Sequence, residues 1–173
     1  MVKLPDGTPL ATPAAVDAKN VLFVSQWDNY PREASVPLSG KANKATLLMA
    51  GTTNAMQSRI DNGEVIATYA DGSTSRLALR NPETWWPIEQ DYFVDDFGFH
   101  IDGELPLRVD LLTGKVRQPT RKDLGDATRT LNGGAATVLT LPLDPKKELK
   151  SLTVRAIANE VVIGLMAVTL DRP

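Results

Sequence analysis

The residues best suited to binding chemistry lie in one stretch, 81–100, which reads NPETWWPIEQDYFVDDFGFH. It contains two of the three tryptophans, Trp85 and Trp86, and the only histidine, His100. It also carries five carboxylates and no lysine or arginine. Large apolar rings and unpaired carboxylates are costly to bury together, because an isolated charge leaves water at a high free-energy cost. The composition therefore predicts that part of this stretch lies at a functional surface.

Aromatic rings beside amides and acids suit a mixed ligand site, for example one in which a ring stacks on a sugar face and polar groups bind the hydroxyls. A second group of this kind lies at 26–31, where turn-forming residues surround two aromatic ones. The candidate ligand-binding residues are Trp27, Asp28, Asn29, Tyr30, Arg59, Trp85, Trp86, Glu89, Gln90, Asp91 and Tyr92. On a strand, Trp85 and Trp86 would point to opposite faces, one into the core and one toward solvent. For each tryptophan, burial in the core and anchoring of a partner protein are the alternatives.

The acids of the chain raise two further alternatives, hydrolysis and metal binding. Glycoside hydrolysis needs two carboxylates at a fixed separation, and Glu64, Glu83, Glu89, Asp91, Asp95 and Asp96 are available. With so many acids some pair always exists, so the pattern does not select an enzyme. Asp91, Asp95 and Asp96 are the candidate ligands of a structural calcium, which prefers oxygen donors. A solvated acidic loop, or salt bridges to Arg80, Arg108 or Arg117, is the competing interpretation, and no other cofactor is expected.

Composition excludes several other classes of protein. There is no cysteine, which removes disulfides and thiolate chemistry and fits a reducing compartment, although an exported domain with a good core does not need disulfides. A single histidine cannot build a multi-histidine zinc site, so His100 is interpreted as structural. The net charge of −2 indicates no nucleic-acid or anionic-membrane partner. No apolar run reaches the ~18 residues of a membrane span, and the N-terminal residues do not resemble a signal peptide.

The elements that must position these residues are predominantly strands. Apolar or alternating runs predict strands at 20–25, 34–38, 45–50, 64–70, 73–79, 105–112, 135–143, from Leu149 onward, and 160–170. Asp71-Gly72 predicts a tight hairpin turn, and Pro37 predicts an edge strand. Residues 57–61 fit either a strand or a helical turn, and 115–126 is predicted to be a polar loop. Short strands separated by turn residues favour an all-β, two-sheet antiparallel sandwich, with one domain at 19–173 behind an extended leader or linker at 1–18.

The order of these segments resembles the jelly-roll modules of the galactose-binding type found beside glycoside hydrolase catalytic domains. The likeness is strongest at 139–144, 147–154 and 158–170, which look like the last three strands of such a module. Residues 39–42 followed by 47–53 are also similar to early strands in accessory domains of large gut-bacterial carbohydrate-active proteins, several of unassigned function. The resemblance implies a galactose-binding-domain-like jelly roll in a secreted, periplasmic or cell-surface bacterial protein.

The resemblance, taken with the candidate binding residues, implies a non-catalytic accessory module that binds a polysaccharide or oligosaccharide. Its binding surface is expected where loops bring 27–30 near 85–92. One alternative is a packing module that docks on its own catalytic domain through the same aromatic residues. Another is a small glycoside hydrolase that uses paired carboxylates.

Overall fold

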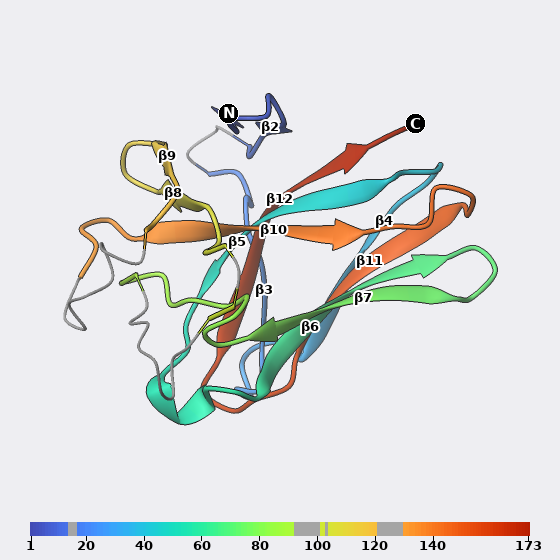
Figure 1. Ribbon diagram of the computed structural model, residues 1–173. Coiled ribbons are helices and arrows are strands. Elements are labelled where there is room, and N and C mark those ends of the chain that lie inside the picture. The colour runs from blue at the N-terminus through green and yellow to red at the C-terminus, as the bar shows by residue number, and fades with distance from the viewer. Residues whose placement is uncertain (14–16, 92–100, 103, 121–129) are drawn as a thin grey trace.

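Two antiparallel β-sheets form the body of the computed structural model (Figure 1). The structure describes residues 1–13, 17–91, 101–102, 104–120 and 130–173. One sheet has six strands, in the order β3 (Leu22–Ser25), β12 (Val162–Asp171), β5 (Lys44–Gly51), β10 (Ala135–Pro142), β8 (Arg108–Asp110) and β9 (Val116–Arg117). The other has four strands, in the order β4 (Glu33–Pro37), β11 (Leu149–Ala156), β6 (Asp61–Tyr69) and β7 (Thr74–Arg80). The predicted all-β antiparallel sandwich is thereby confirmed.

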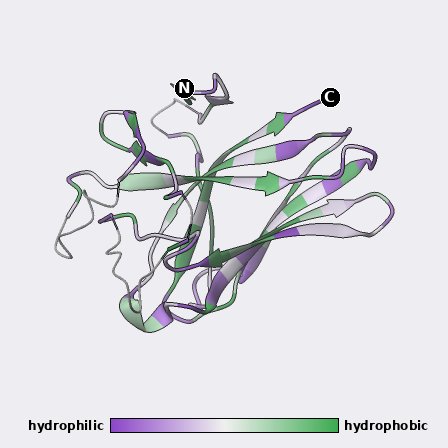
Figure 2. Ribbon diagram, viewed as in Figure 1, coloured by the Kyte–Doolittle hydropathy of each residue, from purple (hydrophilic) through white to green (hydrophobic). Residues whose placement is uncertain are grey.

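The main core lies between the two sheets. Strand β11 contributes every second or third residue to it, including Leu152 and Val154, while its intervening residues face outward. Figure 2 shows this alternation of apolar and polar residues along β11. From the other sheet, Leu47 and Met49 of β5 and Ile163 of β12 meet them. Alternation on β11 therefore reflects one dry and one wet face, as a two-layer sandwich requires.

A second, smaller core covers the outer face of the six-stranded sheet. Leu48 and Ala50 of β5 and Val138 of β10 point to this side, so these strands are buried on both faces. Burial on both faces explains why 45–50 and 135–141 read as nearly continuous apolar runs rather than alternating ones. A short ribbon of β1 (Val2–Lys3) and β2 (Pro9–Leu10) lies over this face. Part of the leader predicted at 1–18 is therefore packed on the sandwich.

Several local predictions have clear outcomes. Pro37 ends β4, which is an edge strand as predicted. The predicted strand at 105–112 is limited to β8, and Val116–Arg117 pairs with it as β9 where a loop was predicted. Residues 57–61 are divided between the end of a 3-10 helix, η1 (Ala55–Gln57), and the start of β6. None of the described segments forms a helix long and apolar enough to cross a bilayer.

The predicted hairpin at Asp71-Gly72 joins β6 to β7 and is held by the Asp71 carboxylate. Its Oδ1 accepts hydrogen bonds from the Ser73 hydroxyl at 2.5 Å and the Ser73 N–H at 2.9 Å. Lys147 Nζ lies 3.0 Å from Oδ2. The Ser73 hydroxyl, followed by the Ser73 N–H and Lys147, lowers the pKa of Asp71 to about 2. Gly72 supplies the positive φ of +84° that this turn needs.

Because the folded pKa of Asp71 is depressed, we expect its contribution to stability to be complete above pH ~4 and to be lost as the pH falls toward 2. An NMR titration of the Asp71 side-chain carbon should give its midpoint near pH 2. In the Asp71→Asn variant, the part of the acid-unfolding curve that arises in this window should disappear. An Asp71 midpoint close to 3.8, the ordinary value, would contradict the assignment.

Candidate functional site

The loop between β3 and β4 presents the exposed aromatic residues that the sequence predicts. The Trp27 side chain is 47% exposed, and its ring centroid lies 6.2 Å from that of Tyr30, with the planes inclined at 60°. The loop is closed by Ser25 N–H donating to Pro31 O at 3.0 Å and Tyr30 N–H donating to Trp27 O at 3.0 Å. Asp28 and Asn29, which separate the two aromatic residues in the sequence, are both exposed. This segment, 26–32, is called the Trp27 loop.

The Trp27 loop is fastened to the turn between β11 and β12. Gln26 Nε2 donates to Ala156 O at 2.7 Å, and the buried Ser25 hydroxyl donates to Val161 O at 2.8 Å. Ala156 N–H in turn donates to Arg32 O at 2.9 Å. These hydrogen bonds hold both ends of the Trp27 loop in place. Less conformational entropy is therefore lost when a ligand binds to the loop.

A third loop, 52–60, reaches the same end of the sandwich and is joined to the others by the buried Asn62. The main-chain oxygen of Asn62 accepts from Ile157 N–H at 2.9 Å and from Ala158 N–H at 3.0 Å. Its Nδ2 donates to Gln57 O at 2.7 Å and to Ile60 O at 3.1 Å. The Trp27 loop, loop 52–60 and turn 157–161 together are called the loop end.

The loop end also exposes three aliphatic side chains that the sequence did not single out. Met56 is 88% exposed, Ile60 is 49% exposed and Ile157 is 42% exposed. Each is surrounded in the sequence by polar and turn-forming residues, a pattern that predicts exposure of an apolar side chain. A large apolar side chain in water favours contact with a ligand or partner. The loop end is thus both aromatic and aliphatic.

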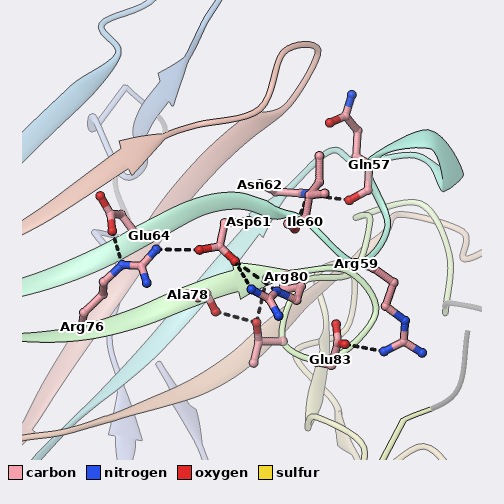
Figure 3. Close-up of polar contacts among 11 residues, drawn as sticks. Gln57, Arg59, Ile60, Asp61, Asn62, Glu64, Arg76, Ala78, Arg80 and Glu83 are labelled. Atoms are coloured by element: carbon pink, nitrogen blue, oxygen red, sulfur yellow. Dashed lines mark hydrogen bonds and ion pairs between the residues drawn. The ribbon is translucent and has the colours of Figure 1, made fainter.

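Arg59 lies on loop 52–60, in an ion pair with Glu83 (Figure 3). Its backbone has a positive φ of 63°, a conformation that a residue with a Cβ adopts only at a cost in free energy. The N–H of Arg59 donates to Asn81 O at 2.8 Å. The sequence placed Arg59 among the ligands for sugar hydroxyls, and the structure places its guanidinium beside a carboxylate of the chain.

The expectation that Trp85 or Trp86 is exposed is wrong, because both side chains are fully buried. Trp85 packs in the core between the sheets, and its Nε1 donates to Thr52 O at 3.1 Å. Trp86 Nε1 donates to Pro82 O at 2.6 Å. The segment turns after Arg80, whose carbonyl accepts from Thr84 N–H and Trp85 N–H, so strand alternation does not apply here. Trp85 supports the loop end from beneath, through Thr52.

Asp91 and its neighbours belong to a separate, buried centre around Arg108. Arg108 is fully buried on β8, with its guanidinium 5.6 Å from the centroid of the Trp86 ring. It donates to Thr137 Oγ1 at 2.6 Å, Pro87 O at 2.8 Å and Gln90 O at 3.1 Å. Arg108 Nε also lies 3.3 Å from Asp91 Oδ1. Burial lowers the pKa of Arg108 to about 10, and the Asp91 carboxylate opposes this shift.

Asp91 is therefore a structural residue and is not free to bind a sugar hydroxyl or a calcium ion. Its side chain is fully buried. Arg117 Nη2 donates to Oδ1 at 2.7 Å, and Arg117 Nη1 lies 2.5 Å from Oδ2 in an ionic contact that lacks hydrogen-bond alignment. Two arginines against one carboxylate disfavour a further cation. Of the predicted neighbours, Glu89 is exposed, whereas Gln90 is half-buried and bonded to Arg108 through its carbonyl.

A row of ion pairs crosses the outer face of the four-stranded sheet. In order, it runs through Glu33, Arg155, Glu64, Arg76, Asp61 and Arg80. Figure 3 shows the part from Glu64 to Arg80. The Arg155–Glu64 and Arg76–Asp61 contacts measure 2.9 Å and 2.6 Å. The hydrogen bonds from Arg80 and Arg76 lower the pKa of Asp61. Because positive and negative groups alternate, the row neutralises itself.

Three of the carboxylates named for hydrolysis are paired with arginines: Glu64, Glu83 and Asp91. A fourth, Glu89, is exposed. Across the described ranges, no group of three or more acidic or histidine side chains is arranged to hold a metal ion. Tyr92, Asp95, Asp96 and His100 lie outside the described residues. The site that the structure brings together consists of Trp27, Asp28, Asn29 and Tyr30, with Arg59 on the neighbouring loop.

Comparison of this chain with protein-family models, with curated proteins and with solved structures gives no match.

Proposed function

We propose that the chain is a non-catalytic accessory module, a jelly roll of the galactose-binding type, that binds glycans at the loop end. The observation that carries the proposal is the half-exposed Trp27 ring with the inclined Tyr30 ring beside it. Two inclined rings offer an apolar surface that a pyranose can contact through its C–H face. Asp28 and Asn29, both exposed on the same loop, supply acceptors and donors for hydroxyls.

The connectivity of the last strands supports the proposed jelly roll. Strand β10 lies in the six-stranded sheet, β11 in the four-stranded sheet, and β12 returns to the middle of the first. In the resembled family the chain likewise runs out on one sheet, turns, and returns up the middle of the other, as β11 and β12 do here. The arginine partners of Glu64, Glu83 and Asp91 support a non-catalytic role, because hydrolysis requires two carboxylates that face a substrate.

A second candidate is docking on a protein surface, such as a catalytic domain in the same polypeptide. The aliphatic side chains of Met56, Ile60 and Ile157, exposed at the loop end, favour it. Aliphatic groups cannot bind hydroxyls, whereas tryptophan, tyrosine, methionine and arginine are enriched in protein interfaces. The two candidates use the same end of the molecule but different side chains, so single variants separate them.

We expect Trp27→Ala to weaken glycan binding by about tenfold or more, because the loss of a stacked ring removes ~1.5–3 kcal/mol of apolar contact. Affinity gel electrophoresis against a polysaccharide panel would find the ligand, and calorimetry would measure the change. The matched control is Leu112→Ala, since Leu112 is 69% exposed but lies between β8 and β9, outside the loop end. Equal effects of the two variants, or no binding to any member of the panel, would refute the proposal.

The docking candidate has a different signature. Replacement of both Met56 and Ile157 with serine should leave glycan affinity unchanged. If the loop end instead docks on a neighbouring catalytic domain, this variant should weaken association of the two separately expressed domains, measured by calorimetry. Loss of domain association without any glycan binding would favour docking over the primary proposal.

A further inference from the structure

The β1–β2 ribbon is an internally bonded unit that touches the sandwich through few groups. Leu4 N–H donates to Thr8 O and Gly7 N–H donates to Leu4 O, both at 2.9 Å, so the ribbon closes on itself. Its strands pair with each other and, within the described residues, with neither of the large sheets. The ribbon can therefore move as one piece without breaking any ladder of the sandwich.

Side chains make most of the attachment. Leu4 and Leu10 are buried on the outer face of the six-stranded sheet, among Leu48, Val138 and Ala167. Beyond these apolar contacts, the Thr169 hydroxyl donates to Pro9 O, and Lys44 Nζ stands 3.9 Å from Asp6 Oδ2 at exposed positions. Exposed ion pairs add little to stability, so the apolar contacts of Leu4 and Leu10, with the partly buried Val2 beside them, hold the ribbon in place.

The contact is incomplete at its margin. A hollow of about 230 Å³ remains between the ribbon and the sheet, lined by Leu4, Pro5, Lys44, Thr46 and Thr140 among others. Atoms beside a void lose the dispersion contacts that close packing provides. The apolar face beneath the ribbon thus accommodates two leucines, and the packing between ribbon and sheet is incomplete at one side.

We propose that this face is an exchangeable binding surface, and that its occupant in trans is the β1–β2 ribbon of a second copy of this chain. The ribbon of a second copy would make the contacts that are seen within one chain, with Leu4 and Leu10 on the apolar face and Pro9 O accepting from the Thr169 hydroxyl. Exchange of an identical element makes no new kind of contact, so it costs little in free energy, and it yields a reciprocal, two-fold dimer. An emptied face would expose Leu48, Val138 and Ala167 to water, which favours a new occupant.

The covalent connection permits this exchange. Strand β2 ends at Leu10 and strand β3 begins at Leu22. A chain of that length can span up to about 40 Å when extended. Strand β2 lies against β12, the second strand from the edge of its sheet, and the proposal requires the same face of a neighbouring copy to lie within that reach. The loop end takes no part, so the exchange and the proposed glycan binding fail independently.

The absence of cysteine from the chain makes the exchange measurable by cross-linking. One variant would carry Pro9→Cys and a second Thr169→Cys, and the two would be incubated together at high concentration with a short thiol cross-linker. We expect a crossed dimer of the two variants, whose yield falls at least tenfold when Leu4→Asp and Leu10→Asp are added to the chain with Pro9→Cys. The Pro9→Cys/Thr169→Cys double variant, cross-linked within one chain at low concentration, shows that the reagent spans the contact.

A synthetic peptide of residues 1–13 provides the second measurement. The full chain with Leu4→Asp/Leu10→Asp releases its own ribbon and should bind the labelled peptide saturably in fluorescence anisotropy. A peptide with the same two substitutions should bind at least about tenfold more weakly, because it lacks the buried leucines. Absence of both the crossed dimer and peptide binding would overturn the proposal. A crossed dimer whose yield is unchanged by the leucine substitutions would also overturn it.

Discussion

Replacement of Arg108 with methionine is expected to lower the free energy of unfolding by about 3–5 kcal/mol, because it leaves buried acceptors without their donor and leaves the buried Asp91 carboxylate with Arg117 alone. Arg108 forms an ion pair with Asp91 and donates hydrogen bonds to Thr137 Oγ1, Pro87 O and Gln90 O. It lies against the Trp86 ring, so its loss also loosens the packing of that ring. Urea unfolding monitored by tryptophan fluorescence would measure the change in stability.

The matched control for this substitution is Arg80→Met. Arg80 pairs with Asp61 across the exposed face of the four-stranded sheet, and its side chain is 46% exposed. Because water screens this pair and Arg76 remains beside Asp61, the expected loss is about 1 kcal/mol or less. Similar losses at Arg80 and Arg108 would show that the buried centre does not stabilise the fold in the way described.

The second large effect is expected at Trp85. Trp85→Ala should cost about 3–5 kcal/mol, because it empties a volume in the core between the sheets, and the Thr52 carbonyl loses the indole N–H. Trp85→Phe should cost less, because it retains much of the apolar volume. Thermal and urea unfolding of the two variants would measure the order of these losses.

The Trp85 variants also separate support from ligand contact. Under conditions in which Trp85→Phe is folded, we expect its glycan affinity to remain within about threefold of the parent protein, a change of ~0.7 kcal/mol. Trp27→Ala should show the opposite pattern, with stability nearly unchanged and affinity lost. A large loss of affinity in folded Trp85→Phe would mean that the indole N–H of Trp85, through Thr52, fixes the geometry of the loop end.

The strands of the sandwich were predictable wherever the local pattern and the tertiary burial agree. The Asp71-Gly72 turn, the run at 45–50 and the run at 160–170 all carry backbone preferences that the sheets satisfy. Pairing partners were not predictable, because the sequence does not specify that β5 lies between β12 and β10. The strand β9 was missed since two residues in a polar region carry too little pattern, and its pairing with β8 depends on contacts made elsewhere.

The exposure of Trp27, Asp28 and Asn29 agrees with the sequence analysis, and their role in binding stays a prediction. The prediction was wrong for Trp85 and Trp86, since it assumed an extended strand, whereas the chain turns after Arg80 and buries both rings. The alternative of salt bridges to Arg108 and Arg117 is confirmed for Asp91, and its assignment as a sugar or calcium ligand is wrong. The sequence allowed both interpretations, because these arginines become partners of Asp91 only when β8 and β9 pair. Charge pairing across strands is a tertiary property that local composition does not contain.

The direction of β12 fixes how the module is oriented when it is attached to something else. This strand of 10 residues begins beside the loop end and runs ~33 Å to the side of the sandwich where both ends of the chain lie (Figure 1). A surface or a fused protein coupled after Asp171 therefore stands a full strand length from Trp27, on the opposite side. Immobilisation through that end presents the aromatic loops to solution, and a directly fused neighbour must fold back along β12 to reach them.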